Sequence, residues 1–142
     1  MTIGRQQPTA TLLPNGRVLI TGGWSTEGSL SSAELYDPSS ATFTSTGSMS
    51  EGRYQNAAQL LPGGLVLVVG GECSGDHCGG VSGPLASSEL YDPATGTFYP
   101  GGQMGQPRYG FASAILSDGS VLILGGQDEA GMLQTAEVYR SR

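Results

Sequence analysis

The sequence contains no lysine and only one histidine, and its six basic residues are all arginines. Against these stand 12 acidic residues, which give a formal net charge of -6. A protein that binds nucleic acid or an anionic membrane through bulk charge needs a basic surface. We therefore expect neither nucleic acid nor a membrane as a partner.

Long apolar runs are also missing. No stretch reaches the roughly 20 apolar residues that a membrane-spanning helix requires. The first segment, Met1–Arg17, lacks the apolar core of a signal peptide. We predict a soluble chain of unknown compartment, and the export of a longer parent protein is left open.

Glycine, in contrast, is abundant, with 24 residues in a chain of 142. This composition disfavours helices and favours tight turns between short strands. The length is sufficient for one domain with a core of its own. We therefore expect a single all-β domain over residues 1–142.

A repeat organises the chain. Three segments align without a gap, each running from an arginine to a Gly-Gly pair: Arg5–Gly23, Arg53–Gly71 and Arg108–Gly126. Each contains a turn signal that suits a tight hairpin, such as Asn15-Gly16. A further strand is predicted at 33–37, 88–92 and 136–139, and a fourth at 42–45 and 97–99. The third copy has no fourth strand.

Four consecutive antiparallel strands per unit are typical of a propeller blade. The Gly-Gly pair, the following tyrosine and the aromatic residue seven positions later (Tyr36 and Phe43, Tyr91 and Phe98) resemble the kelch repeat, in particular its bacterial and galactose-oxidase-like forms. The resemblance covers nearly the whole chain. It implies blades at about 5–49, 53–104 and 108–142. Two departures from the family pattern are phenylalanine in place of the usual fourth-strand tryptophan and the incomplete third copy.

The copy number predicts self-association. The resemblance implies a closed ring of about six or seven blades. The about two and three-quarter blades of this chain cannot close such a ring. The flanks of an isolated chain would be apolar, so we expect a homodimer that completes a six-bladed ring. The alternatives are a trimer, strand exchange that supplies the missing outer strand, and a truncated chain that is partly molten or aggregated.

Alternating strand direction sorts the connections onto two faces. We define face A as the side with the loops between strands two and three and between strand four and the next unit. It collects six candidate ligand-binding residues: Arg5, Trp24, Arg53, Tyr54, Arg108 and Tyr109. Guanidinium groups suit carboxylate or phosphate oxygens, so a small anionic ligand is one candidate partner, beside a protein or a glycan. The alternative is structural: arginines that hold neighbouring loops, tyrosines that form walls, and Glu34, Glu89 and Glu137 paired inside the blades.

The loop from Glu72 to Gly80 gathers two thiols, an imidazole and two carboxylates. Cys73, Asp76, His77 and Cys78 are candidate ligands for zinc or another divalent transition metal. With such a metal, Cys73, Asp76 and His77 would be catalytic candidates, and Arg53 or Arg108 would stabilise developing charge. The competing hypotheses are a Cys73–Cys78 disulfide and a pair of free thiols.

Three functions follow from these hypotheses. The first is a recognition or scaffold module that binds a protein or glycan on face A. The second is a metal-dependent or cysteine-dependent hydrolase of phosphoesters or activated esters. The third is a propeller piece whose assembly is its main property. The copper-radical oxidase activity found among related propellers needs more histidine ligands than the single His77 provides.

Overall fold

The computed structural model describes residues 1–80 and 82–140. Its three larger antiparallel sheets, of three or four strands each, follow one another along the chain. The first has the order β1 (Thr9–Leu12), β2 (Val18–Thr21), β5 (Ala33–Asp37), β6 (Thr42–Ser45), and the second β7 (Ala57–Leu60), β8 (Val66–Val69), β11 (Ser87–Asp92), β12 (Thr97–Gln103). The third consists of β13 (Ala112–Ile115), β14 (Val121–Leu124) and β17 (Ala136–Tyr139). The all-β arrangement of successive antiparallel sheets is confirmed, and its completion by oligomerisation stays a prediction.

The hairpin between the first two strands of each sheet has one recurring design. Gly16, Gly64 and Gly119 occupy the same turn position with φ of 82°, 87° and 82°, a region that side chains disfavour. In two of the turns an Asx oxygen accepts the amide hydrogen two residues later, from Asn15 to Arg17 and from Asp118 to Ser120. The first two strands of each sheet therefore form the tight hairpins that the sequence predicted.

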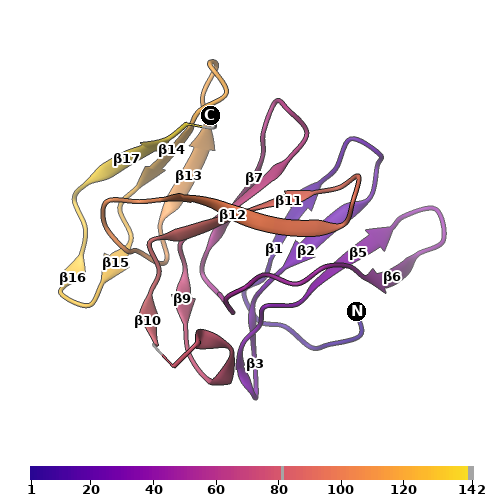
Figure 1. Ribbon diagram of the computed structural model, residues 1–142, viewed down its shortest axis with the longest axis horizontal. Helices are drawn as coiled ribbons and strands as arrows, with labels where there is room; N and C mark the ends of the chain where they lie inside the picture. The colour runs from indigo at the N-terminus through magenta and orange to yellow at the C-terminus, as the bar shows by residue number, and fades with distance from the viewer. Residues whose placement is uncertain (81, 141–142) are drawn as a thin grey trace.

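A short ribbon follows the second strand of every sheet. The three ribbons are β3 (Trp24–Ser25) with β4 (Gly28–Ser29), β9 (Glu72–Cys73) with β10 (Gly83–Pro84), and β15 (Gln127–Asp128) with β16 (Gly131–Met132). They lie together at the lower end of the molecule in Figure 1. That end is face A. The only helical element in the described residues is the 3-10 turn η1 (Asp76–Cys78) on this face.

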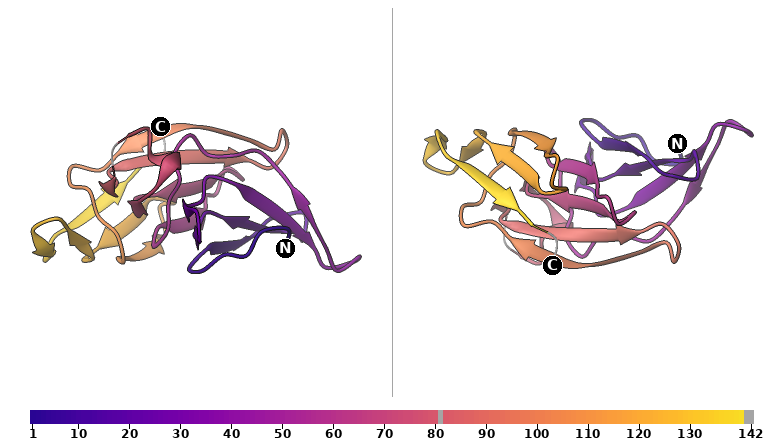
Figure 2. Two further views of the ribbon diagram at one scale, coloured as in Figure 1. Left: turned by 90° about the horizontal axis from the view of Figure 1, so that it is seen from below. Right: turned by 90° about the horizontal axis from the view of Figure 1, so that it is seen from above.

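The sheets stand side by side in a fan, with the inner strands β1, β7 and β13 adjacent (Figures 1 and 2). We call the interface between the first and second sheets the first joint, and that between the second and third sheets the second joint. One apolar core fills the first joint, where Leu13, Leu19 and Met49 meet Val66, Val68 and Tyr91. A second core fills the next joint, where Leu61, Leu67 and Val69 meet Val121 and Ile123. The second sheet therefore packs one face against the first sheet and its other face against the third.

Two details differ from the sequence prediction. The outer strand β12 runs to Gln103, beyond the predicted end at Tyr99, with a register irregularity between Ser87 and Glu89. The ribbons β3–β4, β9–β10 and β15–β16 were not predicted. No helix within residues 1–80 and 82–140 is long and apolar enough to cross a membrane.

Candidate functional site

Arg53 forms a buried node between the ends of β8 and β11. Its Nη1 donates to the carbonyl oxygens of Gly70 and Ser87 at 3.0 and 3.1 Å. Its Nη2 donates to the Ser87 hydroxyl and to the Glu89 carboxylate, both at 3.2 Å. Glu51 makes a further ion pair with Nη2 at 3.3 Å. Burial lowers the pKa of Arg53 below its ordinary value, and the nearby Glu89 and Glu51 carboxylates offset this shift only in part.

The same node recurs in the other two sheets. Arg5 pairs with Glu34 at 3.0 Å, and Arg108 pairs with Glu137 at 2.9 Å. Both also donate to two backbone carbonyls, those of Gly22 and Ser32 or of Gly125 and Thr135. The side chains of Arg5, Arg53 and Arg108 have no exposed surface. Because these guanidinium groups are buried and already paired, they make the contacts that the structural alternative predicts and present no surface to a ligand in this structure.

The glutamates of these nodes also hold the segments that precede each sheet. Backbone amides of Thr2, Ser50 and Gly105 donate to Glu34, Glu89 and Glu137 respectively. Burial raises the pKa of Glu34, but the Thr2 amide and Arg5 bring it below its ordinary value. The structural role predicted for the repeated glutamates matches these contacts.

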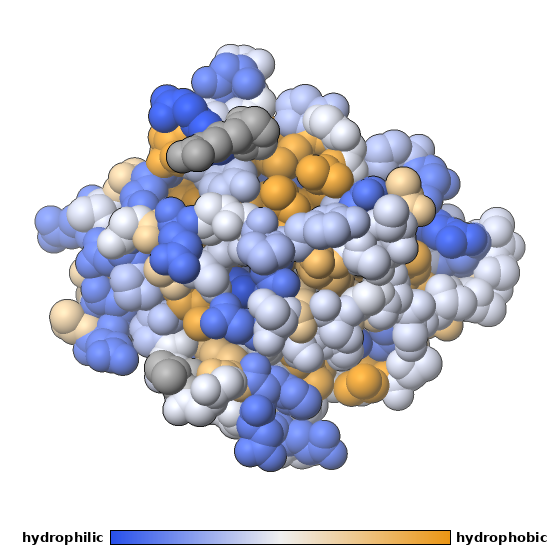
Figure 3. Space-filling view, viewed as in Figure 1, coloured by the Kyte–Doolittle hydropathy of each residue, from blue (hydrophilic) through white to orange (hydrophobic). Residues whose placement is uncertain are grey.

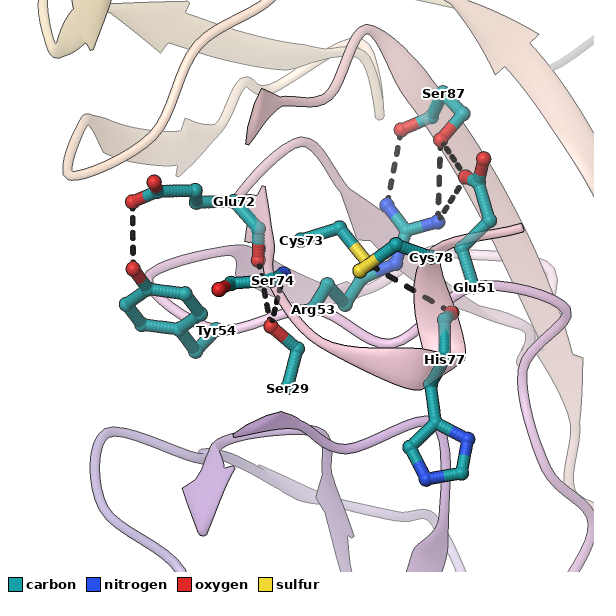
Figure 4. The surroundings of a disulfide bond; sticks show 10 residues. All are labelled: Ser29, Glu51, Arg53, Tyr54, Glu72, Cys73, Ser74, His77, Cys78 and Ser87. Atoms are coloured by element: carbon teal, nitrogen blue, oxygen red, sulfur yellow. Dashed lines mark hydrogen bonds and ion pairs between the residues drawn. A yellow bond between two sulfur atoms is a disulfide. The ribbon is translucent and has the colours of Figure 1, made fainter. Parts of the chain in front are cut away.

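Cys73 and Cys78 form a disulfide, with their Cα atoms 5.6 Å apart (Figure 4). Two sulfurs that are bonded to each other are neither thiolate ligands nor nucleophiles. The His77 imidazole points away from the sulfurs in Figure 4 and lines a hollow with Glu27 and Ser31, while Asp76 is exposed. Across the described ranges no group of three or more His, Cys, Asp or Glu side chains is placed to hold a metal ion. The metal-site and catalytic hypotheses for Cys73, Asp76, His77 and Cys78 require the reduced loop, whereas this structure has the disulfide.

The disulfide-bonded loop contacts the ribbon β3–β4 of the first repeat and the segment that leads into the second sheet. The Ser29 amide donates to the Ser74 carbonyl at 2.8 Å, and the Ser74 amide donates to the Ser29 hydroxyl at 2.7 Å. Gly28 forms an isolated β-bridge with Gly75. The Gly52 amide also donates to the His77 carbonyl at 3.0 Å. The loop is therefore a structural bridge between the first two sheets.

Three aromatic side chains remain accessible on face A. Trp24, Tyr54 and Tyr109 are each half-buried, and the Trp24 and Tyr54 rings lie 5.4 Å apart between centroids. The Tyr54 hydroxyl donates to the Glu72 carboxylate at 2.7 Å. Burial and this hydrogen bond raise the pKa of Tyr54 to about 12. β-Bridges anchor the backbone here, because Tyr54 pairs with Glu72 as Tyr109 pairs with Gln127.

Two glutamines complete this surface, and the sequence analysis did not identify them as candidate site residues. Gln7 and Gln55 have left-handed backbones, with φ of 52° and 53°, and the Gln55 side-chain amide donates to the Gln7 side-chain oxygen at 3.1 Å. Gly110 occupies the same place in the third repeat with φ of 62°. The glycine at an aligned glutamine position was the available signal for this conformation. We define the axial surface as Gln7, Trp24, Tyr54, Gln55 and Tyr109.

Comparison with known proteins supports the repeat. Residues 8–50, which cover the first sheet, match the Kelch motif family model. No curated protein matches the sequence significantly. The second sheet repeats the four-strand order of the matched segment, and the third sheet repeats its first three strands. The node of Arg5, which lies just before the matched segment, recurs in both.

Proposed function

We propose that the chain is a non-catalytic recognition and scaffold module that binds its ligand on the axial surface. The match of residues 8–50 to the Kelch motif supports this proposal. The observation that supports this most is which side chains are accessible on face A. The three arginines are buried in structural nodes and the two cysteines are joined, whereas the axial aromatic rings are accessible. A protein-interaction role is what kelch motifs generally provide.

The chemistry of the axial surface favours an uncharged or weakly charged ligand. Half-exposed aromatic rings stack on apolar or sugar faces, and side-chain amides exchange hydrogen bonds with peptide or hydroxyl groups. An anionic ligand is disfavoured because Glu72 lies beside Tyr54 and the arginines are sequestered. A protein segment or a glycan is therefore the proposed ligand class.

Trp24 offers a direct test because it is the only tryptophan of the chain. Titration with oligosaccharides and with peptides should change its fluorescence, and Tyr109→Ala should weaken the response about tenfold. Ala94→Glu, an exposed change in the turn before β12, is the matched control. A response that Tyr109→Ala leaves unchanged would contradict the axial surface as the binding site.

We also propose that the module self-associates through its two outer flanks. The side of the third sheet that faces away from the second exposes 41% of Leu124 and 39% of Leu116. The equivalent residues of the second sheet, Val69 and Leu61, are 1% and 4% exposed because the third sheet covers them. The third sheet thus presents the kind of surface that the second sheet buries.

The opposite flank belongs to the first sheet. Leu12 is 64% exposed there, whereas Leu60, at the same position of the second sheet, packs into the first joint. The same two kinds of face already meet twice in this chain, at the first and second joints. A second copy would bring the outer face of its first sheet against the third sheet. Repetition of this contact by a twofold axis closes a ring.

Leu124→Glu tests this assembly in solution. A buried charge without a partner should weaken association at least about tenfold, as measured by sedimentation across a concentration series. Ala94→Glu adds the same charge outside the flanks and should leave association unchanged. Equal association of the two variants would refute the flank interface and leave the axial-surface proposal standing.

A further inference from the structure

The outer edge of β17 lies beside an unfilled hollow. β17 pairs with β14 on one side, and within residues 1–80 and 82–140 no strand pairs with its other side. A hollow of about 490 Å³ opens next to this edge. Its lining includes Leu61, Leu65, Leu90, Pro100, Tyr139 and Arg140. Figure 3 shows hydrophobic surface on this side of the molecule, next to the C-terminal end.

The first joint shows what occupies the equivalent place. There the outer strand β12 pairs with β11 and sets Phe98 opposite Tyr91. The Phe98 ring lies 4.9 Å from the Tyr91 ring between centroids. Like Leu35, it packs against the core that contains Leu13. In the first sheet Phe43 is placed opposite Tyr36 in the same way, at 4.8 Å.

Repeat equivalence transfers this arrangement to the third sheet. Tyr139 corresponds to Tyr91, because each pairs with the first valine of the neighbouring strand. Leu61 and Leu90 correspond to Leu13 and Leu35, which contact the phenylalanine-filled core of the first joint. The hollow beside Tyr139 therefore has the walls of an aromatic-binding site and lacks the aromatic side chain.

We propose that β17 is a docking edge for an extended segment of a partner polypeptide, which adds as a fourth antiparallel strand and inserts an aromatic side chain beside Tyr139. The edge supplies backbone hydrogen bonds, and the hollow supplies selectivity for one side chain. In the register of the complete sheets, the aromatic residue lies opposite Tyr139 and the next residue lies opposite Val138.

Arg140 adds a preference for charge. It occupies the position of Asp37 and Asp92, which lie opposite Thr42 and Thr97 in the complete sheets. An exposed arginine in place of these acids favours an acidic residue immediately before the aromatic one. The preferred partner motif is therefore acidic, then aromatic, in an extended segment.

Synthetic peptides test the edge directly. The probe has the sequence of residues 39–46, which contains Phe43, and is compared with its Phe43→Ala form and with a Thr42→Asp form. The phenylalanine peptide should bind at least about tenfold more tightly than the alanine peptide, because burial of the ring is lost in the latter. The aspartate form should bind a few-fold more tightly at low salt, and amide hydrogen exchange should slow at residues 136–139.

Two protein variants separate the hollow from the flanks. Leu65→Ser is compatible with the repeat, because Ser120 occupies the same position in the third unit, and it should weaken binding of the phenylalanine peptide. Leu12→Ser, on the exposed side of the first sheet, should leave peptide binding unchanged. A second format joins each peptide to the C-terminus through a flexible linker. There the phenylalanine form should unfold at a higher temperature than the alanine form. Equal behaviour of the phenylalanine and alanine peptides in both formats would overturn the proposal.

Discussion

The second and third sheets contain nearly the same pattern of residues but differ in what covers them. Val69 is 1% exposed in the second sheet, and its equivalent Leu124 is 41% exposed in the third. The Glu89 side chain is 6% exposed, while that of Glu137 is 26% exposed. The difference shows that a blade of this kind obtains its burial from neighbours on both sides. Stability measurements on matched variants should therefore separate the two sheets.

The arginine node should give the largest difference. Arg53→Ala leaves Glu89 buried without its cation, and we expect a loss of about 3–5 kcal/mol in the free energy of unfolding. Arg108→Ala should cost clearly less, because water can reach the Glu137 carboxylate. Denaturant unfolding at low protein concentration measures both. Equal losses would show that exposure of the partner acid does not set the strength of the node.

Core truncation should give the next largest difference. Leu67 is completely buried, so Leu67→Ala should cost about 2–5 kcal/mol. Leu122, its equivalent in the third sheet, is only half-buried, and Leu122→Ala should cost about 1 kcal/mol or less. Raising the protein concentration should increase the cost of Leu122→Ala if self-association covers it.

The disulfide distinguishes the first joint from the second. In the chain-entropy account a loop as short as that between Cys73 and Cys78 gives about 2 kcal/mol. Thermal unfolding of the Cys73→Ser, Cys78→Ser double variant should show a loss of that order. Hydrogen exchange should quicken at Ser29 and Ser74, which the loop holds together, and not at residues of the second joint. An equal increase of hydrogen exchange in both joints would contradict a local stabilising role of the disulfide-bonded loop.

The smallest expected effect on stability comes from alkaline pH, which acts on Tyr54 of the second repeat. The pKa of Tyr54 in the folded protein is about 12, above the ordinary value of 10.0, so the unfolded chain loses this proton first as pH rises. The stabilisation is complete below pH 10 and is lost as the pH rises from 10 through about 12. Glu72→Gln, which introduces the residue that the third repeat has at Gln127, should reduce the pH dependence, and Tyr54→Phe should abolish it. An unchanged profile in Tyr54→Phe would contradict this assignment.

The sequence predicted the regular parts of the fold because they depend on local patterns. The aligned glycine turns were sufficient to predict the hairpin at the start of each sheet, and the repeated segments predicted β5, β11 and β17. The ribbons were not predictable in this way, because β3–β4 is held by contacts across the first joint, such as that between Ser29 and Ser74. The fate of the arginines was also undetermined, since the same guanidinium group suits a ligand or a buried carboxylate.

We propose that the exposed flanks of the first and third sheets fit each other, and the mass of the protein in solution tests this most directly. Sedimentation equilibrium of the unmodified chain over a wide concentration range should give twice the mass of one chain at high concentration, with dissociation on dilution. A compact particle with the mass of a single chain at every concentration would contradict the account.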